Sequence, residues 1–153
     1  MTPRPFELIR RAGAVMTEAF AKEGPDFTLP QLCVLRALRD DGPRNQTELV
    51  AKCGIDRSTM AAMLANMKDK GMVSRVRDVD DQRALIVEIT PAAKGMLRAH
   101  EAALHHAETE VLKLVDRADR PAFLRALEAI GKGFADPAAR RAPLMKLRRR
   151  TLR

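Results

Sequence analysis

Two segments of the chain, 57–66 and 75–83, carry arginine and polar side chains suited to contacts with nucleic acid. Arg75, Arg77 and Arg83 flank the polar segment 78–82, and a guanidinium group binds phosphate oxygens or enters a narrow minor groove. Upstream, the segment 57–66 offers further hydrogen-bonding side chains. These are Arg57, Ser58, Thr59 and Asn66. Side chains of these types in both segments can make non-covalent contacts with phosphates and base edges, and the elements that position them decide whether they do.

Two helices joined by a sharp turn are predicted to position the segment 57–66. Asn45 and Glu48 have the spacing of a capping box at the start of the first helix, and Gly54 allows the chain to turn. Asp56 can cap the second helix. The second helix has one apolar stripe at helical spacing, formed by Met60, Met63, Leu64 and Met67. The order helix, glycine turn, helix predicts a helix-turn-helix, whose second helix enters the major groove.

The hydrophobic period then changes from helical to alternating. Gly71 is placed to end the helix, and Leu85, Val87 and Ile89 alternate with polar or outward-facing positions. The segment 73–77 is the expected partner strand. A hairpin directly after a helix-turn-helix predicts a winged helix.

These residues resemble the MarR family of bacterial winged-helix transcription regulators. The resemblance rests on Asp81-Gln82-Arg83 at the hairpin tip, the strand 85–89, and the helix start at Thr90-Pro91. It implies that Arg83 enters the minor groove. Asp81 is expected to orient an arginine, because a free carboxylate at this position would repel DNA. Many relatives carry an arginine where Ala62 stands, so strong readout of guanine is not expected there. The predicted DNA-binding residues are Asn45, Arg57, Ser58, Thr59, Ala62, Asn66, Arg75, Arg77, Asp81 and Arg83.

Further helices are predicted on both sides of this unit. Apolar spacing indicates one from Pro5 to Lys22, a second capped by Thr28, a long one starting after Thr90, and a last one opening at Pro121. Their apolar stripes exceed what one winged helix can cover, which favours a two-fold dimer. The expected fold class is mainly α (α+β), a winged helix-turn-helix with N- and C-terminal dimerisation helices. The expected divisions are a single domain at 1–135, with its DNA-binding part at 28–95 and dimerisation helices at 5–24 and 96–135, and a basic tail at 136–153.

Charge and composition narrow the functional classes. The net charge is +8, but residues 138–153 carry +7 of it, so the remainder of the chain is close to neutral. No apolar run approaches the length of a membrane span, and the first residues lack the apolar segment of a signal peptide. No enzyme motif is found. We therefore expect a cytoplasmic protein that is not an enzyme and needs no cofactor.

Histidine and cysteine residues give little indication of a metal site. Cys33 and Cys53 lack the spacing of a zinc site and are expected to be small apolar core residues. The long helix carries His100, His105 and His106, and Glu101 lies four residues before His105. These histidines are expected to lie on the surface. No metal is predicted.

The sequence as a whole is interpreted as a homodimeric transcriptional repressor that binds a pseudo-palindromic operator. The resemblance places a small-molecule effector where the dimerisation helices meet the DNA-binding part, and the residue types there favour an aromatic or other hydrophobic acid. Three alternatives stay open: a basic architectural DNA-binding protein, a protein-interaction module, and a redox sensor acting through Cys33. The predicted effector-binding residues are Met16, Phe20, Phe27, Leu32, Arg36 and His100.

Overall fold

The computed structural model of the 153-residue chain describes residues 4–81 and 85–135. Arg83 and the basic tail at 136–153 lie outside the described residues. In chain order the elements are α1 (Pro5–Lys22), α2 (Leu29–Asp41), β1 (Arg44–Asn45), α3 (Gln46–Cys53), α4 (Arg57–Asp69), β2 (Val73–Arg77), β3 (Leu85–Ile89), α5 (Pro91–Lys113) and α6 (Arg120–Ala135). The chain is mainly helical with one small antiparallel sheet, which is the predicted fold class.

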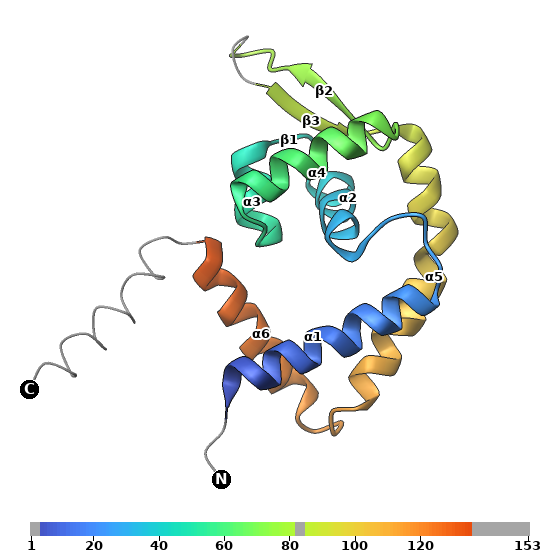
Figure 1. The fold of residues 1–153 in the computed structure, drawn as a ribbon, viewed down its shortest axis with the longest axis vertical. Helices are drawn as coiled ribbons and strands as arrows, with labels where there is room; N and C mark the ends of the chain where they lie inside the picture. Colours follow the sequence, from blue (N-terminus) through green and yellow to red (C-terminus); the bar gives the residue numbers. More distant parts are fainter. Residues whose placement is uncertain (1–3, 82–84, 136–153) are drawn as a thin grey trace, which may run out of the picture.

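The long helix α5 joins two groups of elements (Figure 1). At one end of α5 lie α2, α3 and α4 with the hairpin of β2 and β3, and at its other end lie α1 and α6. The helix-turn-helix of α3 and α4 and the hairpin that follows confirm the predicted winged helix. This arrangement leaves α1 and the far half of α5 outside the DNA-binding unit, while α6 runs back from the end of α5 and contacts α3 (Figure 1).

Side-chain caps explain why the helices begin where they do. Thr28 and Asn45 each form a complete capping box, with Gln31 and Glu48 respectively. Asp56 and Thr90 cap α4 and α5 by accepting from the backbone N–H three residues later. Each cap satisfies an N–H group that has no partner within the helix. The predicted helix starts are confirmed except for α6, which begins at Arg120 with proline in its second position.

The sheet has the strand order β1-β3-β2 and is antiparallel throughout. In the hairpin Val73 pairs with Ile89 and Arg77 with Leu85, so both predicted strands are confirmed to the residue. The third strand, β1, pairs Arg44 with Val87 and was not predicted. A two-residue strand is too short to show an alternating pattern, so only its pairing with β3 reveals it.

The core lies beneath the helix-turn-helix. Met60, Leu64 and Met67 of α4 are fully buried, while Met63 lies half-buried at the edge of the same stripe. The side chains around them come from α2, α3, β3 and α5, and include Leu35, Leu49, Val87 and Leu97. This core fixes α4 against the rest of the chain and leaves its opposite face in solvent.

The stripe on α1 is buried only at its C-terminal end. Phe20 is buried, whereas Phe6 is 92% exposed and Ile9 52% exposed. On α6, Leu124 and Ile130 are also exposed. Large apolar side chains in water indicate a surface that is covered by something else in the functional molecule.

Candidate DNA-binding surface and effector cavity

The outward face of α4 carries small and polar side chains. Arg57, Ser58, Thr59, Ala62 and Asn66 are all exposed, because the apolar stripe of the same helix is turned into the core. A helix with so small an outer face can approach base edges closely, since an α-helix fits the width of the major groove. The structure therefore presents all five of these predicted residues together on one helix.

The start of α4 is tied to the start of α3 by side chains that the sequence did not single out. Arg57 donates from Nη2 to Thr47 Oγ1 at 3.2 Å, and Gln46 donates from Nε2 to the Arg57 carbonyl oxygen at 3.2 Å. Both partners stand ten or eleven residues from Arg57, so no local pattern predicts them. Their contacts hold the two helices of the helix-turn-helix in a fixed relation.

Two other predicted DNA-binding residues already have structural partners. The Asn45 side chain accepts the Glu48 N–H at 2.9 Å, which makes it a helix cap. Asn66 Oδ1 accepts from Nε2 of Gln31, a buried residue of α2, at 3.5 Å. The Gln31 side chain therefore links α2 to α4 by a hydrogen bond. A sequence pattern could identify Gln31 only as part of the cap of α2.

The hairpin brings two of the predicted arginines onto one strand. Arg75 is half-buried and Arg77 exposed, and as residues i and i+2 of β2 they share a face. At the tip, the Asp78 carboxylate accepts the backbone N–H groups of Asp80 at 2.8 Å and Asp81 at 3.4 Å, which shapes the turn. Arg83, predicted to enter the minor groove, lies beyond this described part of the tip.

The cap of α4 predicts a specific pH dependence of stability. Hydrogen bonds from Thr59, through its side chain and backbone N–H, and from the Ser58 hydroxyl lower the pKa of Asp56 to about 2, from an ordinary value of 3.8. A lowered folded-state pKa stabilises the fold above the unfolded-state value, and this contribution is lost as the pH falls from about 4 through about 2. The Asp56→Asn protein should therefore lose less stability than the parent over that window.

The measurement is the thermal midpoint of parent and Asp56→Asn protein at several pH values between 2 and 6. Asn keeps an acceptor oxygen for the cap but does not titrate. Asp26→Asn, at an exposed position between α1 and α2, is the control for removing one carboxylate. Parallel curves for the parent and the Asp56→Asn protein would contradict the prediction.

A cavity of about 400 Å³ lies among α1, α2, α5 and α6. Three predicted effector residues, Met16, Phe20 and Leu32, line it, and its size is within the range of small-molecule sites. The structure places the other three outside the lining. The remaining lining residues are Ala19, Leu29, Leu104, Ala107, Glu108, Val111, Leu112, Phe123, Leu124 and Leu127.

Phe27 and His100 contact each other edge to face beside the cavity. The Phe27 ring is buried, 6.2 Å from the Phe20 ring and 5.6 Å from the edge-on His100 imidazole, measured between ring centroids. His100 also approaches the Met96 carbonyl oxygen through Nδ1 at 3.0 Å. These two residues therefore support the wall that Phe20 contributes.

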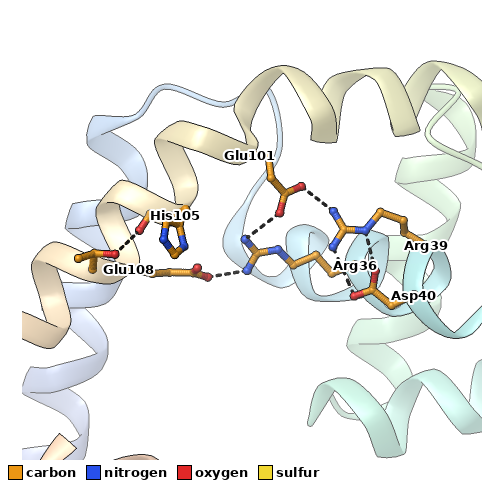
Figure 2. Close-up of polar contacts among 7 residues, drawn as sticks. Arg36, Arg39, Asp40, Glu101, His105 and Glu108 are labelled. Atoms are coloured by element: carbon orange, nitrogen blue, oxygen red, sulfur yellow. Dashed lines mark hydrogen bonds and ion pairs between the residues drawn. The ribbon is translucent and has the colours of Figure 1, made fainter.

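Arg36 belongs to a group of charged side chains that joins α2 to α5 (Figure 2). Its Nη1 lies 2.5 Å from Glu108 Oε1, and its Nη2 lies 4.0 Å from Glu101 Oε1. Arg39 contacts Glu101 at 2.6 Å and Asp40 at 2.7 Å, and the hydrogen bond from Arg39 lowers the pKa of Asp40. Of these residues, only Glu108 lines the cavity.

The two cysteines are less buried than predicted. Cys33 is exposed, because it lies on the side of α2 away from the core stripe, and Cys53 is half-buried. Desolvation by surrounding protein raises the pKa of Cys33, with the charge of Arg36 opposing it, and burial raises the pKa of Cys53 to about 11. A raised pKa keeps a thiol protonated and slow to oxidise.

Within residues 4–81 and 85–135, no three histidine, cysteine or acidic side chains are grouped so that they could hold a metal ion. None of the helices in these ranges has the length and apolar character needed to cross a membrane.

Comparison with known proteins identifies the relatives of this fold. The MarR family model matches residues 27–85. The transcriptional repressor NicR of Pseudomonas putida is 32% identical over 101 residues, which are 65% of this chain and 64% of NicR. The chain thus spans slightly less than two thirds of NicR. The transcriptional regulator HosA of Escherichia coli is 33% identical over 94 residues, which are 61% of this chain and 70% of HosA.

Solved structures have the same architecture. BpsR of Bordetella bronchiseptica, whose DNA binding is regulated by 6-hydroxynicotinic acid, aligns with a TM-score of 0.77 at 23% identity, over 83% of this chain and 92% of BpsR. The repressor CouR, solved bound to a 23-mer DNA duplex, aligns with a TM-score of 0.69 at 27% identity, over 81% of this chain and 87% of CouR. The chain belongs to the MarR family of winged helix-turn-helix transcriptional regulators.

Proposed function

We propose that the chain is a homodimeric, cytoplasmic repressor that binds operator DNA and is released by a small aromatic or hydrophobic acid. The observation that carries the proposal is that α5 lines an apolar cavity of ligand size and also belongs, through Leu97, to the core that holds α4. The relative NicR is a repressor, and BpsR responds to an aromatic acid. Both support the same assignment for this chain.

DNA binding is assigned to α4 and the hairpin. Arg57, Ser58 and Thr59 stand at the N-terminal end of α4, where the Asp56 carboxylate already caps the helix. Arg57 is therefore the group at this end assigned to a phosphate. Ala62 offers a methyl group to a thymine but no hydrogen bond. Groove shape and the hairpin arginines therefore supply much of the proposed specificity.

The dimer is assigned to the apolar surface of α1 and α6, within the proposed dimerisation segments 5–24 and 96–135. Phe6, Ile9, Leu124 and Ile130 are the large exposed side chains that support it. A two-fold dimer covers such a surface with its own copy, because the same patch meets itself across the axis. Two copies of α4 then face two half-sites about one DNA turn apart.

The effector is assigned to the cavity lined by Met16, Phe20 and Leu32. A ligand lowers DNA affinity only if it binds the dimer geometry that does not fit DNA more tightly than the geometry that does. A typical coupling of this kind is about 1–3 kcal/mol. Apolar walls suit an aromatic ring, and Arg36 beside the cavity is the cation assigned to the acid group.

A panel of aromatic acids tests this assignment. At least one acid, with 6-hydroxynicotinate and benzoate among those tried, should raise the melting temperature of the protein and release bound DNA. The Arg36→Ala protein should lose about tenfold in affinity for that acid, since a charged hydrogen bond contributes about 1.5 kcal/mol, while its DNA affinity stays near that of the parent. The measurements are thermal melting and fluorescence anisotropy of labelled DNA.

The same panel separates the competing functions. If only oxidants release DNA, and Cys33→Ser abolishes the response, the protein is a redox sensor and the cavity is not an effector site. The raised pKa of Cys33 favours the effector assignment. Equal affinity for operator and random DNA would instead favour an architectural protein that uses its arginine-rich segment 138–153.

A further inference from the structure

The charge of the cavity wall does not match the proposed ligand. Among the described residues that line the cavity, Glu108 is the one ionisable side chain, and all the others are apolar. A carboxylate on a ligand in the cavity would lie near the Glu108 carboxylate, and like charges at close range disfavour each other. The nearest assigned cation, Arg36, does not line the cavity.

Glu108 connects the cavity wall to Arg36. Its Oε1 lies 2.5 Å from Arg36 Nη1 (Figure 2). The same residue lines the cavity. The Glu108 carboxylate therefore holds the position at which a carboxylate in the cavity would pair with this guanidinium. Its side chain is 53% exposed, so water is available to it on the other side.

We propose that Glu108 is an internal competitor for the effector, whose carboxylate replaces that of Glu108 on Arg36. This inference rests on the proposed effector site and adds the way in which the acid is recognised. In the exchange Arg36 keeps one close carboxylate partner, and the Glu108 carboxylate is transferred into water. The ion pair that is given up is that of Arg36 with Glu108, whose side chain is 53% exposed. Ion pairs of exposed side chains contribute little to stability.

The exchange leaves a second bridge between the same two helices in place. Arg39 Nη1 lies 2.6 Å from Glu101 Oε2, and neither residue lines the cavity. Helix α2 therefore stays attached to α5 when Arg36 changes partner. The exchange selects for an acid group because a neutral amide cannot replace a carboxylate as the partner of a guanidinium.

Titration calorimetry of the full-length chain tests the exchange. The ligands are benzoate and 6-hydroxynicotinate, each compared with its neutral amide, and the proteins are the parent and Glu108→Gln. Removing the competing charge should raise affinity for the acids about fivefold or more and leave affinity for the amides unchanged. Gln has nearly the helix propensity of Glu, so the variant is expected to fold like the parent.

A matched variant controls for the loss of one acid from α5. Glu110→Gln removes a carboxylate that pairs with Lys113 and does not line the cavity. It should change acid affinity less than twofold.

The outcomes distinguish the two levels of the proposal. If acids bind the parent and Glu108→Gln binds them no more tightly, the exchange is wrong and the effector site stands. If amides bind the parent as tightly as acids, the exchange is likewise wrong. If neither acids nor amides bind the parent, the proposed effector class is wrong and the exchange with it.

Discussion

The Leu64→Ala protein is expected to be less stable than the parent by about 2–5 kcal/mol in free energy of unfolding, the range for leucine truncation in a packed core. Leu64 is 0% exposed and lies on the buried stripe of α4 between Met60 and Met67. Its removal leaves a space that surrounding side chains fill only in part. Because this stripe fixes α4, the loss is expected to lower the fraction of protein able to bind DNA.

Urea unfolding followed by circular dichroism measures the effect, and Leu85→Ala is the matched control. Leu85 is 52% exposed at the hairpin end of β3, so its truncation should cost less than about 1 kcal/mol. A Leu64→Ala protein as stable as the Leu85→Ala protein would show that α4 is not packed as described.

Replacing Phe6 and Ile9 together by glutamate is expected to weaken the dimer by roughly 1000-fold, since two anchor residues at an interface contribute about 2 kcal/mol each. Both side chains are largely exposed in the single chain, and both lie outside the lining of the cavity. Charges at these positions would have to be buried without partners in the dimer. A monomer presents one α4 to DNA. Affinity for an operator with two half-sites should therefore fall as the dimer is lost.

Sedimentation velocity over a range of concentrations measures the dimer, and Val79→Glu is the control. Val79 is 95% exposed and lies between β2 and β3 in the sequence. Figure 1 shows these two strands far from α1 and α6. The control protein should sediment like the parent. A double variant that stays dimeric at the same concentrations would mean that this end of α1 is not the interface.

Local sequence signals predicted most of the elements. Asn45, Asp56 and Thr90 placed helix starts correctly because capping depends on residues only three positions apart. The strands of the hairpin were equally clear, because alternation and the Gly71 turn are local features. The fold class therefore followed from patterns within short segments.

Long-range pairing could not be predicted in the same way. The contact of Arg36 with Glu108 joins residues 72 positions apart, and that of Gln31 with Asn66 joins residues 35 apart. Strand β1 is defined only by its partner β3. Half of the predicted effector residues lie behind or beside the cavity wall for the same reason: helix spacing gives the face of a residue but not the neighbour that covers it.

Selection from a random DNA library with the purified full-length chain tests the central claim most directly. Repeated binding and amplification followed by sequencing should enrich a pseudo-palindromic site whose two half-sites are centred about one helical turn, roughly 10 base pairs, apart. Its affinity should exceed that for unselected DNA by at least roughly 10³-fold at the same salt concentration. A library that stays random after several rounds, or equal affinity for selected and unselected DNA, would contradict the assignment of this chain as a sequence-specific dimeric regulator.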